Sequence, residues 1–408
     1  MSLLHHTLKN FYKIFCPFIF LFIFQSTPLA SETIRVLLPV TSNKIKITFE
    51  KGEIFSDETE SVDCRELQES DEISEIINKE KREHKLRPVI AVESRQSFDI
   101  KLNDGIMLTE NRNVSGTSRR ENIIDPNKKY RSLIFHNQSP TLEINGNFIK
   151  GDLEIRFVSG TFKIINVIDI EDYLKYTISK EMNPTWPIEA LKAQAVLART
   201  FVLKKKYLMK NCLYDIGFSA LDQVYGSFKE DYLEVIQAVS STSGEVLKYN
   251  GEIIDALYHS CCGGNTSSAK EIFGFDKPYL TSRPCPCRGE CPYGKGWSYK
   301  MKISELQKIF GLNKIDNIVE ENNQIKIIGN RKILLSKNAF RERIGFNQLK
   351  SSKYSLTFSK SELKISGSGF GHTVGLCQYG AKSMAEENKD YKEILLHYFN
   401  GVTIEKIY

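Results

Sequence analysis

The stretch that decides the fold is residues 169–201, DIEDYLKYTISKEMNPTWPIEALKAQAVLARTF. Apolar residues recur at helical spacing in its first part, which predicts a short helix over about 171–181. Pro184 and Pro187 then interrupt the chain, and Pro187 suits the first turn of a second helix. Residues 188 to about 209 are rich in strong helix formers, so they predict the longest helix of the chain.

The sequence on either side of this stretch has a different pattern. Residues 33–56 and 88–168 alternate between apolar and polar positions, which is typical of strands. Three segments have the residues of tight hairpin turns: Asn103-Asp104-Gly105, Asn145-Gly146 and Asn250-Gly251. We expect a last helix over 380–399. Because strand runs precede helix runs without regular alternation, we expect a mixed α+β fold, a largely antiparallel strand-rich body with packed helices that form a substrate groove.

Composition limits the class of protein. The chain has 408 residues, of which 26% are charged and 41% are hydrophobic, and this excludes a disordered or fibrous protein. The formal net charge is +6, but the basic residues are dispersed, which argues against nucleic acid as a partner. Residues 57–85 are almost all charged, so we expect a solvated helical insertion or a disordered segment there.

Residues 1–30 have the features of an export signal. Lys9 and Lys13 form a basic region without acidic residues, residues 18–24 (FIFLFIF) form a continuous apolar run, and residues 28–30 end on a small side chain. The apolar run is short for a transmembrane helix, which needs about 20 residues. We therefore expect an exported protein, in the periplasm or on the wall side of the membrane, with an uncleaved anchor as the alternative.

Cysteine usage is uneven. The chain has nine cysteines, and five of them lie between Cys261 and Cys291, close to His259. Such clustering indicates a local metal site or disulfides. Zinc takes four nitrogen or sulfur ligands in tetrahedral geometry. Disulfides are the alternative, since they persist outside the cytoplasm. Neither the CC nor the CPC sequence opens a helix in a βαβ unit, which argues against a thiol oxidoreductase.

Four segments together resemble the SpoIID/LytB family, which comprises the stage II sporulation protein D and amidase-enhancer proteins. They are residues 169–201, DQVYG at 222–226, YHSCCGGNTSSA at 258–269, and SGSGFGHTVGLCQYGAKSMAEENKDYKEILLHYFNG at 366–401. They occur in the family order. The departures from the family pattern are Asn183, Asn265 and Thr373. The resemblance implies a strand-rich N-terminal region over 31–155, which contains the charged insertion, and a SpoIID-like catalytic core over 156–408.

The resemblance implies a peptidoglycan lytic transglycosylase that acts on glycan strands, preferably those stripped of peptides. Such an enzyme cleaves the MurNAc–GlcNAc bond and leaves 1,6-anhydro-MurNAc ends during division or sporulation. The family's catalytic acid corresponds to Glu181. At the C-terminus of a helix and beside Met182 and Trp186, a carboxyl group should have a raised pKa. The alternative function is a non-catalytic peptidoglycan-binding scaffold that enhances an N-acetylmuramoyl-L-alanine amidase.

The resemblance also suggests residues that contact the substrate. Lys192 and Arg199 lie seven positions apart, so they share one face of the long helix. They are expected either to bind the glycan or to form salt bridges. The other candidates for substrate binding are Gln223, Tyr225, His372 and Gln378. The favoured ligands of a structural Zn²⁺ are Cys262, Cys285, Cys287 and Cys291, with His259 as a possible substitute; the chemistry itself requires no cofactor.

Overall fold

The structure is a computed structural model, and it describes residues 32–40, 42–57, 86–103, 105–111, 128–210, 212–217, 222–225, 232–287 and 291–408. The expected export signal over 1–30, nearly all of the charged insertion and the turn at Asp104 lie outside these residues. In the described part of the chain, no helix combines the length and the apolar character needed to cross a bilayer.

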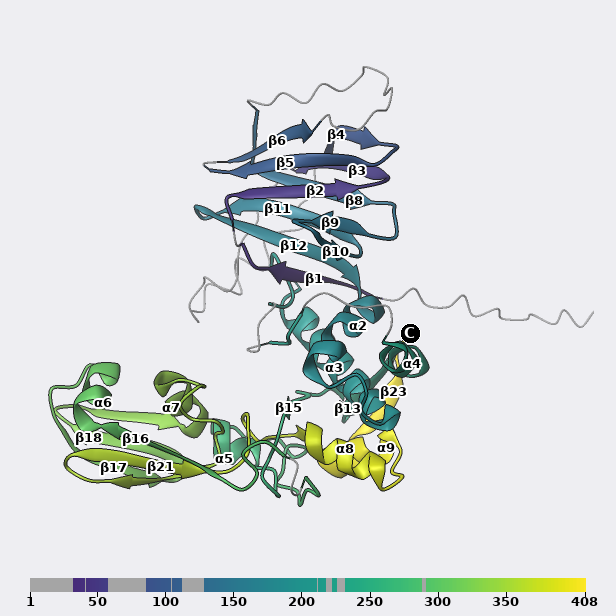
Figure 1. Cartoon of the computed structure of the whole chain (residues 1–408). Coiled ribbons are helices and arrows are strands. Elements are labelled where there is room, and N and C mark those ends of the chain that lie inside the picture. Colours follow the sequence, from purple (N-terminus) through teal and green to yellow (C-terminus); the bar gives the residue numbers. More distant parts are fainter. Residues whose placement is uncertain are drawn as a thin grey trace, which may run out of the picture.

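The first half of the chain forms two six-stranded antiparallel sheets (Figure 1). One has the order β1-β12-β11-β8-β3-β4 and the other β10-β9-β2-β5-β6-β7. Alternate residues of both sheets point into one hydrophobic cluster, as the two-residue period of a strand requires. The strands are β1 (Thr33–Leu38), β2 (Lys44–Phe49), β3 (Gly52–Asp57), β4 (Leu86–Val92), β5 (Gln96–Leu102), β6 (Ile106–Asn111), β7 (Lys129–Tyr130), β8 (Ser132–Asn137), β9 (Leu142–Ile144), β10 (Asn147–Ile149), β11 (Asp152–Val158) and β12 (Thr161–Asp169).

Three helices follow directly. The two predicted ones are α2 (Ile170–Glu181) and α3 (Ile188–Leu208), and a third, α4 (Leu233–Ser241), was not predicted from the sequence. The small residues of α3 let neighbouring elements approach closely, so it is buried along most of its length. A sheet of order β14-β13-β23 packs against it, formed by β13 (Glu245–Tyr249), β14 (Glu252–Ile253) and β23 (Thr403–Lys406). The Asn145-Gly146 and Asn250-Gly251 turns join β9 to β10 and β13 to β14, both with positive φ at the two residues.

The C-terminal region contains two helices where the sequence predicts one over 380–399. They are α8 (Gln378–Glu386) and α9 (Tyr391–Tyr398). Asn388 has a φ of 63°, which interrupts the first helix, and Asp390 begins the second through a capping box with Glu393. The prediction of a single helix is therefore wrong. Before α8, β15 (Tyr258–His259) pairs in parallel with β22 (Leu376–Cys377), and α5 (Ala269–Phe273) lies between them in sequence.

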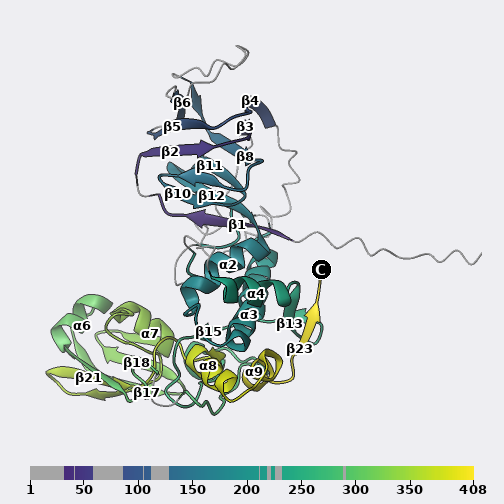
Figure 2. The same ribbon diagram turned by 45° about the vertical axis from the view of Figure 1, so that its right-hand side comes forward.

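Residues 297–367 form a small unit with its own hydrophobic cluster, to one side of the helices (Figures 1 and 2). It contains β16 (Trp297–Lys302), α6 (Ile303–Phe310), β17 (Ile315–Glu321), β18 (Gln324–Gly329), β19 (Lys332–Ser336), α7 (Lys337–Ile344), β20 (Tyr354–Phe358) and β21 (Glu362–Gly367). The boundary expected at 155/156 falls inside β11, whose pairing with β12 continues the strand-rich body to Asp169. The mixed α+β fold with mostly antiparallel strands is confirmed.

Candidate functional site

Glu181 is the last residue of α2, and its position follows from how that helix begins and ends. The Asp169 side chain accepts hydrogen bonds from two backbone N–H groups of the first turn, so it caps the N-terminus. Twelve residues later the chain becomes extended at Met182. The residue before Pro184 is disfavoured in the helical conformation, which prevents a further turn. Glu181 is thus fixed at a helix C-terminus.

The carboxyl group of Glu181 lies against residues 222–225. Its Oε1 accepts a hydrogen bond of 2.7 Å from the backbone N–H of Val224. The hydroxyl of Tyr258, from β15, is buried beside the same carboxyl group. Burial raises the pKa of Glu181 because it removes water from the charged form, and the Val224 N–H and the Tyr258 hydroxyl oppose this rise only partly. Glu181 therefore keeps its proton to a higher pH than an exposed glutamate.

Gln223 and Tyr225 hold the segment that contacts Glu181. The side chain of Gln223 is buried; its Oε1 accepts from the Tyr173 hydroxyl at 2.8 Å and its Nε2 donates to the carbonyl of Ala198. The Tyr225 hydroxyl donates to Oδ1 of Asn166 at 2.7 Å, and its ring stacks on Tyr173. Both predicted substrate-binding residues thus contact the protein itself, in positions that orient Val224.

Several buried polar atoms on the surrounding elements have no hydrogen-bond partner among the described residues. They include the Thr177 hydroxyl, one turn before Glu181, and the Nε2 of Gln378 at the start of α8. Both amide atoms of Gln194 are also unpaired, and its helix α3 packs against α2 and α8. Buried polar groups are normally hydrogen-bonded. These atoms are therefore candidates for hydrogen bonds to a bound ligand or an ordered water.

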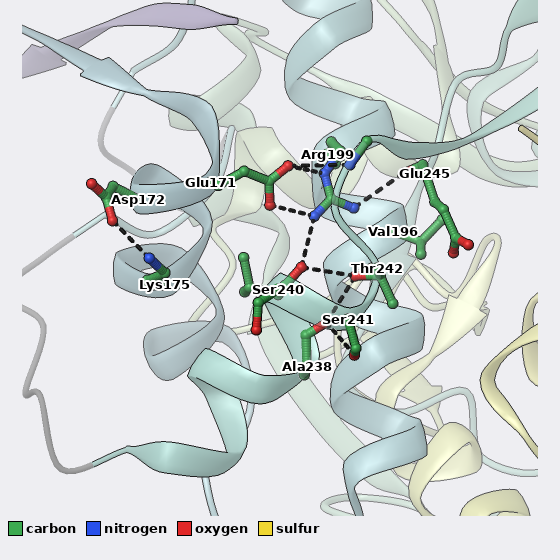
Figure 3. A network of polar contacts seen from close by, with 12 residues as sticks. Glu171, Asp172, Lys175, Val196, Arg199, Ala238, Ser240, Ser241, Thr242 and Glu245 are labelled. Carbon is green, nitrogen blue, oxygen red and sulfur yellow. Dashed lines mark hydrogen bonds and ion pairs between the residues drawn. The ribbon is translucent and has the colours of Figure 1, made fainter. Parts of the chain in front are cut away.

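Arg199 is fully buried, and its guanidinium donates to both carboxylate oxygens of Glu171, at 2.8 and 2.7 Å (Figure 3). It also donates to the backbone carbonyl of Glu245. Lys192 contacts Glu189 at 2.7 Å. For both residues the structure shows the salt-bridge alternative rather than a side chain free to bind glycan. Arg199 instead joins α2 and α3 to the start of β13.

His372, a predicted substrate-binding residue, lies against the backbone of Tyr258. Its Nδ1 accepts from the backbone N–H of Val374, and its ring centroid is 5.6 Å from that of His259. Burial is the main reason why the pKa of His372 is lowered to about 4, so this ring is neutral near pH 7. The flanking Gly371 has a φ of 103°, and a Cβ there would approach His259 within 2.9 Å. A glycine is therefore required for this close contact.

Four buried cysteines meet behind the site: Cys262, Cys285, Cys287 and Cys377. Their Sγ atoms all lie within 4.8 Å of one another. The predicted fourth ligand, Cys291, is instead bonded to Cys261 in a disulfide. The prediction of Cys291 is therefore corrected: parallel pairing of β15 with β22 brings Cys377 to the other three.

His259 does not belong to this four-sulfur group. Its Nδ1 lies 3.1 Å from the carbonyl of Val374, and its Nε2 is buried without a hydrogen-bond partner among the described residues. Sequence reasoning missed Cys377 as a member of the four-sulfur group and Tyr258 as a neighbour of Glu181. The YHSCCGG segment, which contains Tyr258, was the available signal for the second.

Comparison with known proteins supports the family resemblance seen in the sequence. The family model described as SpoIID, stage II sporulation protein, matches residues 158–249, which include α2, α3 and Glu181. An uncharacterized protein of Brachyspira hyodysenteriae is 33% identical over 325 residues, which cover 74% of this chain and 82% of that protein. Stage II sporulation protein D of Bacillus subtilis is 28% identical, covering 59% and 75%. The amidase enhancer of Bacillus subtilis is 28% identical, covering 57% and 40%. This chain belongs to the SpoIID family.

Proposed function

We propose that this protein is a peptidoglycan lytic transglycosylase that cleaves the MurNAc–GlcNAc bond of glycan strands, preferably after removal of their peptides. The observation that carries the proposal is the Glu181 carboxyl, largely buried at the end of α2 with a raised pKa. It occupies the position that the family resemblance gives to the catalytic acid. Similarity to a sporulation protein and to an amidase enhancer supports a role in remodelling the cell wall.

The proposed reaction needs one carboxyl group. Glu181 donates its proton to the glycosidic oxygen as the bond from that oxygen to the muramyl C1 breaks, and GlcNAc leaves with a free hydroxyl. The Glu181 carboxylate then accepts the proton of the muramyl C6 hydroxyl, whose oxygen bonds to C1 and closes the 1,6-anhydro ring. Glu181 ends protonated again, and no water is consumed. A hydrolytic glycosidase would instead use two carboxyl groups.

The surroundings of Glu181 support this chemistry. Among the described residues, no second acidic group contributes to the shift in its pKa. The unpaired buried atoms of Thr177, Gln194 and Gln378 suit the hydroxyl and acetamide groups of a glycan. The neutral His372 ring adds no charge to the site, and because its Nδ1 accepts from Val374, its Nε2 carries the proton as a donor.

The test is mass spectrometry of the products released from intact and peptide-stripped peptidoglycan. We expect 1,6-anhydro ends from the parent protein and none from Glu181→Gln, which keeps an oxygen to accept from Val224. Glu234→Gln is the matched control, since Glu234 is an exposed residue of α4. Anhydro ends released by Glu181→Gln, or reducing ends released by the parent, would overturn the proposal.

We further propose that Cys262, Cys285, Cys287 and Cys377 hold a structural Zn²⁺. Four buried thiols around one point form a donor set that suits tetrahedral zinc, so the residues present fit the ion. When bound, it would join the segment over 281–287 and Cys262, in the segment after β15, to Cys377, the residue before α8. The alternative is a second disulfide, for which Cys262 and Cys287 are nearest, with 3.3 Å between their Sγ atoms.

Metal analysis and thiol counting of the purified protein test this site. We expect one zinc per chain, lost in Cys377→Ser and retained in Cys291→Ser, since Cys291 lies outside the four-sulfur group. Removal of zinc by a chelator should lower the melting temperature, because metal binding contributes to folding free energy. Absence of zinc together with a Cys262–Cys287 disulfide in peptide mapping would overturn the assignment.

Export is part of the proposal. The disulfide between Cys261 and Cys291 supports it, because disulfides persist in oxidising compartments. Fractionation of cells should find the protein on the wall side of the cytoplasmic membrane, without residues 1–30 if the signal is cleaved. Recovery from the cytoplasm with both cysteines reduced would contradict export.

The second candidate function is a wall-binding protein that enhances an N-acetylmuramoyl-L-alanine amidase, favoured by similarity to an amidase enhancer. The two candidates make different predictions for one variant. If the protein acts by binding alone, Glu181→Gln should stimulate an added amidase as well as the parent does. If cleavage is required, stimulation should disappear with the anhydro products.

A further inference from the structure

Two aromatic side chains lie exposed next to the proposed site. Tyr293 and Phe370 are 43% and 39% exposed, and their rings stack with centroids 5.7 Å apart and planes 16° from parallel. They come from segments 77 residues apart in sequence. Exposed aromatic residues normally occur singly, and a pair that stacks at the surface indicates a binding function.

The backbone fixes this pair closely. Phe370 and Cys261 exchange two backbone hydrogen bonds, of 2.8 and 3.1 Å. Cys261 is joined by its disulfide to Cys291, and the Tyr293 carbonyl accepts from the N–H of Gly369 at 2.9 Å. Hydrogen bonds and one covalent link thus close a ring through both aromatic residues. We call the stacked rings of Tyr293 and Phe370 the aromatic platform. Because its backbone is fixed in this way, the platform loses little conformational entropy when a ligand binds.

The conformation of the platform is one that few residues adopt. Tyr293 has a φ of 57°, which is uncommon for a residue with a side chain. Gly369 has a φ of 85°, and a Cβ there would lie 2.4 Å from the Cys261 carbonyl oxygen. Backbone strain of this kind tends to occur at functional sites. The stacked rings therefore depend on an unusual local backbone that packing and the disulfide hold in place.

The charge beside the platform is positive. The Lys350 ammonium lies 5.5 Å from the centre of the Tyr293 ring and donates to the carbonyl of Asn347, and in the described part of the chain no carboxylate pairs with it. Its backbone carbonyl accepts from Gly371, which fixes it to the same segment. Lys353 likewise donates to a carbonyl, that of Asn265. Residues 297–367 contain 14 lysines and arginines but six acidic residues, whereas the whole chain has 56 and 50.

We propose that Tyr293, Phe370 and Lys350 form a glycan-binding subsite that holds a strand with free carboxylates, away from the bond that is cleaved. The inference rests on the proposed function, since it names a second contact for the same polymer. Cys261, which pairs with Phe370, follows three positions after Tyr258, which lies beside Glu181; as extended chain this step spans roughly 10 Å. One sugar ring packs on the aromatic pair, and Lys350 pairs with the lactyl carboxylate that removal of the stem peptide exposes.

Binding is measured on Glu181→Gln, by co-sedimentation and calorimetry, with peptide-stripped glycan strands as the probe. Chitin oligosaccharides, which lack carboxylates, are the neutral probe. Adding Tyr293→Ala and Phe370→Ala should raise the Kd for both probes at least about tenfold, which corresponds to about 1.4 kcal/mol. Adding Lys350→Met should raise the Kd for stripped strands and leave the Kd for chitin oligosaccharides unchanged.

Matched controls separate the platform from general effects. Tyr207→Ala on α3 and Phe148→Ala on β10 remove aromatic residues that are 76% and 57% exposed, and neither should change binding. Tyr293→Leu with Phe370→Leu keeps apolar bulk and removes the flat rings, so it should weaken binding even if the alanine variant folds poorly. Unchanged glycan binding in the folded leucine variant would overturn the proposed platform. So would a variant that still binds glycan and loses only the binding of a partner protein.

The outcome also distinguishes the two proposals. If the active parent releases anhydro ends but the aromatic substitutions leave glycan binding unchanged, the proposed subsite is wrong and the proposed reaction is supported. If binding depends on the rings but the active parent releases no anhydro ends, the reaction is wrong and the platform stands. A Glu181→Gln protein that binds neither probe overturns the platform.

Discussion

The two ends of helix α2 hold the same residue type in opposite environments. Burial raises the pKa at both Glu171 and Glu181. At Glu171, the Arg199 guanidinium, the Tyr408 hydroxyl and the Gly244 N–H together more than offset burial, so the pKa is lowered and the carboxylate stays charged. At Glu181 no cation from the described residues contributes, and the helix C-terminus disfavours negative charge. A buried glutamate is thus structural where a cation accompanies it and becomes a candidate acid where none does.

Glu181→Gln should give the largest effect on catalysis. Loss of a general acid typically costs a factor of about 10²–10⁴ in rate. The free energy of unfolding near pH 7 should change little, because the amide removes no cation–carboxylate pair. Rate measurements on stripped glycan and urea denaturation check the two parts. A variant that loses activity only because it unfolds would break the comparison.

Glu171→Gln should give the reverse pattern. It leaves the buried Arg199 guanidinium without a charged partner, and breaking such a pair typically costs about 3–5 kcal/mol. Any folded fraction should still cleave glycan, since Glu171 contacts Arg199, Tyr408 and Gly244 and not Glu181. Stability equal to the parent in a urea titration would contradict the structural role of the pair.

The two glutamates should also respond to pH with opposite sign. Because the pKa of Glu171 is lowered on folding, its stabilising contribution is present above its unfolded pKa, near 4.5, and is lost as pH falls below that value. The pKa of Glu181 is raised, so its contribution is present below about 4.5 and is lost as pH rises through the folded pKa.

Unfolding free energies measured from pH 3 to 8 check these signs. The parent minus Glu171→Gln difference should grow with rising pH, and the parent minus Glu181→Gln difference should fall. Cleavage should likewise decline as pH rises past the Glu181 pKa, since the first step needs its proton. If the two stability differences changed with pH in the same direction, the opposite pKa shifts of Glu171 and Glu181 would be contradicted.

Tyr225→Phe should have the smallest effect. It removes one hydrogen bond to Asn166 and keeps the ring that stacks on Tyr173, so we expect a loss of about 0.5–1.5 kcal/mol in stability. Activity should stay within a few-fold of the parent. A loss comparable with that of Glu181→Gln would indicate that the hydroxyl contacts substrate, as predicted from the sequence for this residue.

The sequence predicted the local features well. Helix formers and prolines located α2 and α3, and two Asn-Gly pairs located hairpins, because these signals act within a few residues. The split of 380–399 into α8 and α9 was missed, since Asn388 adopts a left-handed conformation that the helical pattern hides.

Contacts between distant segments could not be read from the sequence. Cys377 lies 86 residues beyond Cys291, and the pairing of β15 with β22 is what brings it to the other thiols. The sequence left two roles for Arg199, contact with glycan or a salt bridge, because its partner, Glu171, is 28 residues away on another helix. Which partner each of these side chains contacts depends on tertiary packing, and a local sequence pattern does not encode that packing.

The most direct measurement is a ¹³C NMR titration of the glutamate side-chain carboxyl carbons, with Glu171→Gln and Glu181→Gln used to assign the two signals. We predict that Glu181 titrates above the usual value of 4.5 and Glu171 below it. A Glu181 carboxyl that titrates at or below the Glu171 value would contradict the assignment of Glu181 as the protonated acid.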